Sequence, residues 1–194
     1  MFIELTDHLR CPRDHPEAYL VLLPDEVIGR VVRSGHLGCP ICGAIFDVAE
    51  GVAELDAGPA ASEAPVLAPD AAHALLGLTG PGGYVVLAGS AAAGWPELSE
   101  LNPGVAFVAV NPPSAVRDAA PVLSVVRAPL IPLKARSMRG VVLGGGLGGD
   151  PAWVREAARV TLPRLRVVGQ GPEPDVAELD LLASADGCWV AARR

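Results

Sequence analysis

The segment Cys39-Pro40-Ile41-Cys42-Gly43 is the feature that most restricts how this chain can fold. It holds two thiols on one tight turn, where backbone amides can point at the sulfur atoms and Gly43 relieves the turn. Cysteines in this spacing are typical of one half of a structural zinc site. A closed site needs two more ligands, so the sequence predicts a second half elsewhere in the N-terminal region.

The matching segment upstream is Cys11-Pro12-Arg13-Asp14-His15. A regular knuckle would carry its second cysteine at position 14, but Asp14 stands there and His15 follows. Because imidazole is a good zinc ligand with a longer reach than a thiolate, Cys-x3-His can replace Cys-x2-Cys. We therefore predict a structural zinc ion held by four side chains: Cys11, His15, Cys39 and Cys42.

Other uses of these residues stay open. Asp14 is the alternative ligand in the first half, and His36 is a further candidate shortly before Cys39. A disulfide is disfavoured, because three cysteines leave one unpaired and a cytosolic chain keeps its thiols reduced. Four protein ligands leave no position for water, so the expected site is structural. Cys188 is expected to be a small buried apolar residue.

Composition divides the chain into two units. Residues 57–69 contain three prolines and small residues without periodicity, which is typical of a linker. We expect a β-rich unit over residues 1–56 and a larger unit over residues 70–194. The pattern of the first unit predicts two hairpins. One covers residues 19–32 with a turn at 24–26, and the other covers residues 44–55. A unit this small usually needs a staple such as a metal.

The larger unit alternates apolar runs with helix signals. The runs are rich in valine and leucine, as suits buried strands, and cover residues 84–88, 105–110, 122–126, 140–143 and 165–168. Helices are expected at residues 70–78, 96–101 and 151–160, with Asp70 and Asp150 as N-caps. A closing hairpin is expected over residues 176–192. This alternation predicts an α/β fold with a mostly parallel sheet.

Three N-terminal segments also carry a family resemblance, at residues 9–12, 39–43 and 45–55. They look like the zinc ribbon of small methyltransferase-activator proteins, a module also fused to the front of many bacterial methyltransferases. The resemblance covers about residues 5–56 and implies a zinc ribbon there. The sequence departs from the family in the first knuckle, where Asp14 and His15 replace the usual second cysteine.

Three later segments stand in the order and spacing of another family, at residues 84–94, 131–143 and 159–168. They match a first strand with its glycine loop, a Leu-Pro-Phe segment with the fourth strand, and a helix end with the fifth strand. Residues 70–194 thus resemble a class I S-adenosylmethionine-dependent methyltransferase. This implies a compact, Rossmann-like domain, and such folds bind ligands at the carboxyl ends of their strands.

The resemblance assigns six positions to the cofactor: Ala88, Gly89, Ser90, Gly94, Asn111 and Arg127. The family carries acids before the glycine loop, at the ribose hydroxyls and at the adenine amino group, where this chain has Ala88, Asn111 and Arg127. Asn111 can still hydrogen-bond a hydroxyl without charge assistance, but Arg127 offers only donors to a donor group. We expect cofactor binding to be weak or absent. A shifted register or a variant site is the competing interpretation.

Residues 144–149 match the G-x-G-x-x-G pattern between a predicted strand and a predicted helix. The run follows the fourth predicted strand, whereas the dinucleotide fingerprint usually follows the first. We therefore favour a mobile loop lining the cleft over a nucleotide site.

Charge excludes some function classes. The chain has 22 acidic and 15 basic residues and a net charge of −7, which argues against a generic nucleic-acid binder. The imbalance is uneven, with 10 acids and 4 bases in residues 1–56 but 7 acids and 10 bases in residues 127–194. No apolar run is long enough to span a membrane, and no signal-peptide pattern opens the sequence. A cytoplasmic protein is expected.

These observations favour a zinc-binding, methyltransferase-like accessory protein. It would be non-catalytic, with a degraded S-adenosylmethionine site, and would act as a scaffold that pairs with itself or with another protein. The alternative is an active S-adenosylmethionine-dependent methyltransferase on an unknown acceptor, so enzyme activity stays open. Zinc is the expected cofactor, and S-adenosylmethionine belongs to the alternative.

Overall fold

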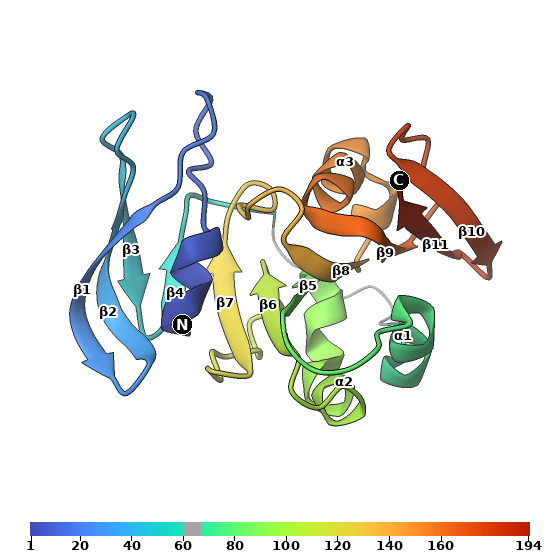
Figure 1. The fold of residues 1–194 in the computed structure, drawn as a ribbon, viewed down its shortest axis with the longest axis horizontal. Coiled ribbons are helices and arrows are strands. Elements are labelled where there is room, and N and C mark those ends of the chain that lie inside the picture. The colour runs from blue at the N-terminus through green and yellow to red at the C-terminus, as the bar shows by residue number, and fades with distance from the viewer. Residues whose placement is uncertain (60–66) are drawn as a thin grey trace.

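The computed structural model describes residues 1–59 and 67–194, which form one 11-stranded sheet with short helices (Figure 1). Residues 60–66 of the expected linker lie outside the described residues. The N-terminal elements are η1 (Ile3–His8), β1 (Val21–Ile28), β2 (Val31–Gly38), β3 (Ile45–Ala49) and β4 (Val52–Glu54). The later elements are α1 (Pro69–Leu76), β5 (Tyr84–Ala88), η2 (Gly89–Gly94), α2 (Trp95–Leu101), β6 (Ala106–Val110), β7 (Leu123–Arg127), β8 (Met138–Leu143), η3 (Leu147–Gly149), α3 (Pro151–Val160), β9 (Thr161–Gln170), β10 (Leu179–Ala185) and β11 (Cys188–Arg193).

The strand order is β1-β2-β3-β4-β7-β6-β5-β8-β9-β11-β10. The strands from β4 to β9 pair in parallel, and those outside this centre pair antiparallel. All of β5 is buried, as a strand covered on both faces should be. The order in which strands are added reverses at β5: β6 and β7 follow on one side of it, and β8 and β9 on the other (Figure 1). The predicted α/β fold with a mostly parallel centre is confirmed.

The first hairpin turns at a different place from the prediction. Residues 24–26 lie within β1, and the chain reverses at residues 29–30 between β1 and β2. Register shifts between Pro24 and Glu26 and between Glu26 and Val27 absorb these residues as bulges. An edge strand tolerates proline and bulges, because one side of it forms no ladder. The second predicted hairpin is present as β3 and β4.

The helices follow the prediction except at one N-cap. Asp150 caps α3, since its carboxylate accepts a hydrogen bond from the Ala152 amide at 2.8 Å. In α1 the N-cap is Ala68, and Asp70 lies inside the helix, so the expected Asp70 cap is wrong. The helix α1 starts one residue earlier than predicted, at Pro69, because the fixed φ of proline suits the first helical turn. Among the described residues, no helix combines the length and apolarity needed to cross a membrane.

Different elements cover the two faces of the central sheet. The core on one face includes side chains of α1 and α2, such as Leu76 and Leu98. The core on the other face includes Leu5 of η1, Leu133 of the β7–β8 connection and Trp153 of α3. Residues 111–122 and 128–137, which follow β6 and β7, contain no helix. The N-terminal segment therefore covers strands that a crossover helix would otherwise cover.

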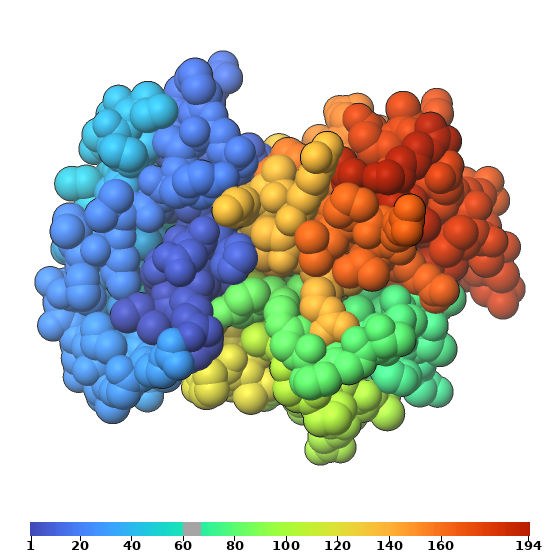
Figure 2. Space-filling model, in the orientation of Figure 1, coloured from blue at the N-terminus to red at the C-terminus, as the bar shows by residue number. Residues whose placement is uncertain are grey.

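The N-terminal strands and the α/β strands belong to one sheet. β4 pairs with β7 through Val52↔Val125, Ala53↔Val126 and Glu54↔Arg127. On the face shown in Figure 2, the blue N-terminal residues lie directly against the green to orange residues of the α/β part. The two parts thus share hydrogen bonds as well as a hydrophobic core.

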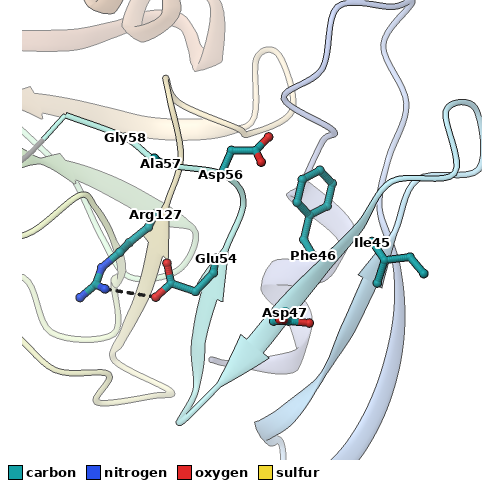
Figure 3. A pocket seen from close by; sticks show the side chains of 8 residues that line it. All are labelled: Ile45, Phe46, Asp47, Glu54, Asp56, Ala57, Gly58 and Arg127. Carbon is teal, nitrogen blue, oxygen red and sulfur yellow. Dashed lines mark hydrogen bonds and ion pairs between the residues drawn. The ribbon is translucent and has the colours of Figure 1, made fainter.

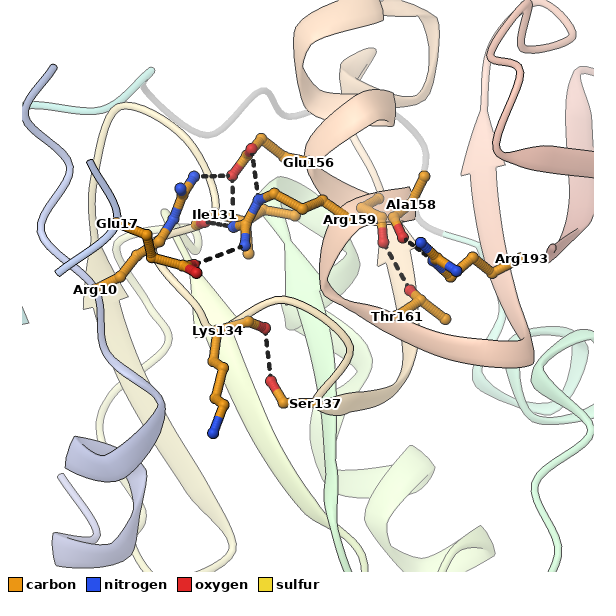
Figure 4. Close-up of polar contacts among 11 residues, drawn as sticks. Arg10, Glu17, Ile131, Lys134, Ser137, Glu156, Ala158, Arg159, Thr161 and Arg193 are labelled. Carbon is orange, nitrogen blue, oxygen red and sulfur yellow. Dashed lines mark hydrogen bonds and ion pairs between the residues drawn. The ribbon is translucent and has the colours of Figure 1, made fainter. Parts of the chain in front are cut away.

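Ion pairs tie the N-terminal segment to α3 (Figure 4). Arg10 contacts the Glu156 carboxylate at 2.7 Å, and Arg159 contacts the same carboxylate at 2.8 Å. Arg159 also lies 3.6 Å from Glu17 and donates to the carbonyl of Ile131 at 3.1 Å. Partly buried, charge-assisted contacts of this kind are stronger than exposed pairs, so they help to hold the N-terminal segment against α3.

Candidate functional site

Four side chains of types that can bind a metal meet at one end of the N-terminal sheet. The ligand atoms of Cys11, His15, Cys39 and Cys42 all lie within 4.8 Å of one another, in a group that could hold a metal ion. Two backbone bonds form the second knuckle: the Cys39 amide donates to Ala44 at 2.8 Å, and the Gly43 amide donates to Cys39 at 3.0 Å. Gly43 has a φ of 70°, which glycine adopts without strain. The turn therefore needs this residue.

The spacing of the donor atoms fits one tetrahedral ion. The sulfur atoms of Cys11 and Cys42 are 3.8 Å apart, and Cys39 Sγ is 3.4 Å from His15 Nε2. Ligands at about 2.0–2.3 Å from one zinc ion would stand roughly 3.4–3.8 Å apart in tetrahedral geometry. These two spacings and the chemistry of the donor set thus fit zinc.

The ring of His15 is oriented by its other nitrogen. Nδ1 lies 2.6 Å from the carbonyl oxygen of Pro16, so it carries the proton and donates. Nε2 is then the nitrogen with the free lone pair, and it faces Cys39. A backbone carbonyl that fixes the tautomer in this way is typical of histidine ligands.

The two buried thiols, Cys11 and Cys39, differ in the direction in which their pKa is shifted. Burial raises the pKa of the Cys11 thiol to about 12. Burial also opposes ionisation of Cys39, but hydrogen bonds from the backbone N–H groups of Cys42 and Ile41 and from the thiols of Cys42 and Cys11 together outweigh it and lower the pKa of that thiol to about 6. The knuckle amides thus favour the thiolate, the form that binds a metal. A bound cation would favour the thiolate of Cys11 as well.

The other candidate ligands lie elsewhere. Asp14 is exposed and is not part of the four-residue group. His36 lies on β2 and contacts Asp47 at 3.0 Å and Asp25 at 3.8 Å. Cys188 begins β11 and is partly buried. None of these three side chains belongs to the group that could hold a metal.

The positions assigned to the cofactor lie along the carboxyl ends of β5, β6 and β7. Ala88 ends β5, and the buried residues Gly89 and Ser90 begin η2, which ends at Gly94. Asn111 follows β6 directly, and Arg127 ends β7. The fold therefore brings these six residues to one edge of the sheet, as the resemblance implies.

The side chain of Asn111 forms hydrogen bonds with the neighbouring backbone. Its side-chain amide donates to the carbonyl of Ala128 at 2.7 Å, and its oxygen accepts from the amide of Ala128 at 3.0 Å. The residue is 5% exposed. Both polar atoms of the side chain are thus paired with the chain that follows β7.

Gly58 closes over this pair. A Cβ atom on Gly58 would overlap the carbonyl oxygen of Ala128 and both side-chain polar atoms of Asn111. The segment after β4 therefore crosses the carboxyl ends of β6 and β7 in direct contact with them. Sequence reasoning missed Gly58 and Ala128, because a glycine in a proline-rich stretch and a backbone pairing carry no motif.

Arg127 pairs with β4. Its guanidinium lies 3.1 Å from the Glu54 carboxylate, and both side chains are exposed. The residue opposite Arg127 in the β4–β7 ladder is Glu54, so the pair forms directly across two strands. Arg127 therefore points to the N-terminal strands rather than lying free at the edge.

The glycine run at residues 144–149 packs onto the turn after β5. A Cβ atom on Gly144 would overlap the amide of Ala91 and would lie 2.8 Å from Ser90 Oγ. Trp189 donates to the carbonyl of Gly148 at 3.2 Å, which fixes the far end of the run. Gly144, Gly148 and Gly149 thus serve close packing, whereas a Cβ atom on Gly146 would meet open space. The Ser90 hydroxyl is buried and has no hydrogen-bond partner among the described residues.

Comparisons with known proteins return structural similarity alone. No family model and no curated protein matches the sequence. Two crystal structures of the antibiotic-resistance methyltransferase Kmr are similar. One has a TM-score of 0.44 and 11% identity, covering 69% of this chain and 97% of its own. The other has a TM-score of 0.43 and 13% identity, covering 70% of this chain and 98% of its own.

Proposed function

We propose that the chain is a zinc-binding, methyltransferase-like accessory protein that does not bind S-adenosylmethionine and acts as an interaction scaffold. The contact of Gly58 with the Asn111–Ala128 pair carries the proposal. Ligands of open α/β sheets bind at the carboxyl ends of the strands, next to the point where strand order reverses. In this chain the β6–β7 part of that edge is filled by the chain itself.

Binding of S-adenosylmethionine at the ends of β6 and β7 would also cost free energy. A ribose hydroxyl could pair with Asn111 only if that side chain released two buried hydrogen bonds to Ala128. Leaving buried backbone groups unpaired costs about 1–3 kcal/mol each. At the adenine position Arg127 offers donors to a donor, and its charge is already paired with Glu54.

The zinc ion has a structural role in this proposal. Cys11, His15, Cys39 and Cys42 supply four ligands, so no position is left for a reacting water. Thiolate ligands persist in a reducing compartment, which supports a cytoplasmic location. The unit over residues 1–56 then serves as a metal-clamped extension of the unit over residues 70–194, across the segment 57–69.

Calorimetry and metal analysis on one purified sample test both halves of the proposal. We expect one zinc per chain and no heat of binding with S-adenosylmethionine. Cys42→Ala should lose the zinc, whereas Cys188→Ala should keep it, because Cys188 lies outside the cluster. Cys42 is exposed, so its truncation leaves little cavity. Zinc retained by Cys42→Ala, or tight binding of S-adenosylmethionine, would contradict the proposal.

One observation favours the alternative of an active methyltransferase. The buried Ser90 hydroxyl, which lacks a hydrogen-bond partner among the described residues, lies in the turn assigned to the cofactor. A ligand there could satisfy it. Saturable binding of S-adenosylmethionine that is lost in Ser90→Ala would select this alternative.

A further inference from the structure

The outer face of the N-terminal sheet presents a defined row of side chains. The strand registers place Leu23 of β1, His36 of β2 and Asp47 of β3 opposite one another. The row continues through Glu54 of β4 and Arg127 of β7. Five adjacent strands at about 4.8 Å spacing give a row roughly 19 Å long. We call this row, together with its neighbours on the same face, the outer face.

A second row on the outer face is apolar. Val21, Gly38 and Ile45 lie opposite one another on β1, β2 and β3. Val21 is 54% exposed, Leu23 of the first row 56% and Ile45 68%. Gly38 lies between Val21 and Ile45 and supplies no side chain. Clustered exposed aliphatic side chains of this kind mark interaction surfaces.

Acidic groups border these apolar side chains. Asp25 and Asp47 both contact His36, and a single imidazole cannot neutralise two carboxylates. Glu54 pairs with Arg127 and Asp56 with Arg13, but all four side chains keep substantial exposure. The face belongs to the acidic region of the chain, where residues 1–56 hold 10 acids against 4 bases. A partner that covers it must bring positive charge.

A pocket of about 490 Å³ extends the outer face toward the segment after β4 (Figure 3). Its lining includes Ile45 and Asp47 of β3, the carboxylates of Glu54 and Asp56, and Arg127, which pairs with Glu54. A long cationic side chain fits this combination, because its methylene stem can lie on Ile45 while its charged end meets the carboxylates. The three carboxylates outnumber the single arginine in the lining, so the pocket favours a lysine or arginine at one end of the partner.

The edge strand β1 is unsuited to binding a partner through an added strand. β1 contains Pro24, two register shifts and the acids Asp25 and Glu26, all of which hinder pairing with an added strand. A partner is therefore held by side chains on the face rather than by backbone bonds to β1.

We propose that the outer face binds a basic, extended protein segment that turns both cationic and aliphatic side chains toward the sheet. The inference rests on the proposed scaffold function and names the partner chemistry that the scaffold accepts. About six extended residues span the 19 Å row at roughly 3.3 Å each. Aliphatic side chains cover Val21, Leu23 and Ile45, and cationic side chains meet Asp25, Asp47 and Glu54.

A labelled eight-residue peptide in which pairs of arginines alternate with pairs of valines tests this proposal with the zinc-loaded, full-length protein. This order places both kinds of side chain on each side of an extended segment. Fluorescence anisotropy should show saturable binding that weakens as salt rises. Leu23→Lys and Asp47→Lys should each weaken binding at least tenfold, and Leu23→Met should preserve it. The control is Leu182→Lys on β10, because Leu182 is 52% exposed and lies on the opposite edge strand. This variant should bind within twofold of the parent.

Three results would overturn the proposal: no saturable binding, equal binding by Leu23→Lys and Leu182→Lys, or equal binding of a peptide with glutamate in place of arginine. A dimer seen by light scattering and lost in Leu23→Lys, without peptide binding, would assign the face to a second copy instead. Zinc content and thermal midpoints confirm folding of each variant. The calorimetry with S-adenosylmethionine is independent of this surface, so either proposal can fail alone.

Discussion

Asn111 shows how a side chain can stand at a predicted site position and serve another purpose. The resemblance placed it at the ribose hydroxyls, and the structure places it at the end of β6 as expected. Its two polar atoms nevertheless bind the backbone of Ala128. A backbone partner has no residue type to recognise, so sequence reasoning could find the position but not the contact.

The cysteine and histidine group was more predictable. Cysteine spacing within a tight turn is a local property, and it pointed to the four side chains that the structure brings together. The inclusion of His15 also followed from reach, since imidazole extends further than the thiolate that it replaces. Sequence reasoning thus works best where the chemistry depends on neighbours along the chain.

At the residue scale, Tyr84 should make stability depend on alkaline pH. Burial, with smaller effects from the Glu4 and Asp7 carboxylates, raises the pKa of this phenol from 10 to about 12. Its stabilising contribution is fully present below pH 10 and is lost as pH rises through 12. Two pKa units correspond to about 2–3 kcal/mol. Urea unfolding between pH 9 and pH 12 should show this loss, and Tyr84→Phe should remove it.

The matched control is Tyr19→Phe, because Tyr19 is 42% exposed. This variant should lose stability with pH as the parent does. A parental pH dependence in Tyr84→Phe would mean that another group causes the loss.

At the scale of elements, the segment after β4 should depend on glycine at position 58. A methyl group there would overlap Asn111 and Ala128, so Gly58→Ala must displace the segment or break the pair. We expect a loss of about 1–3 kcal/mol in the free energy of unfolding. Gly38→Ala should change it by less than about 0.5 kcal/mol, since the nearest atom is 4.0 Å away.

Denaturant unfolding of both glycine variants measures this difference. If Gly58→Ala unfolds like Gly38→Ala, the segment after β4 is not held against the sheet, and the main support for a closed cofactor edge disappears.

The elements of the α/β part were predictable because buried parallel strands are continuous apolar runs. The runs at 84–88 and 140–143, for example, correspond to β5 and β8. The hairpin turn at 24–26 was mispredicted because proline and acids signal turns, and the same residues occur in bulged edge strands. Ile28-Gly29-Arg30 was the better signal, since Gly29 has a φ of 62°.

At the scale of the whole molecule, the join between β4 and β7 lies beyond sequence reasoning. Parallel pairing between distant segments has no local signature, and β4 is only three residues long. The join means that the predicted units do not present separate sheets. Instead, the N-terminal residues extend the α/β sheet and cover one of its faces.

Removal of the metal should therefore destabilise the whole chain in one transition. The tryptophans Trp95, Trp153 and Trp189 all report on the α/β part. Loss of a ligand present at 1,000 times its Kd costs about 4 kcal/mol. For a chain of this size, that lowers the thermal midpoint by roughly 10 °C. Tryptophan fluorescence and far-ultraviolet circular dichroism should both show this shift after chelation.

Cys42→Ala is the control for chelation, and its midpoint should not respond to the chelator. A tryptophan transition that stays in place while the circular dichroism shifts would show two units that unfold independently.

The β4–β7 pairing also sets an order of events during synthesis. Glu54 and Arg127 are 73 positions apart, so β4 leaves the ribosome long before its partner strand exists. Until then, the early strands have an open edge at β4 in addition to the blunted edge at β1. Closing so long a loop is slow, and unpaired strand edges are prone to aggregation until their partner strand forms. An early-binding metal would keep those strands compact during that interval.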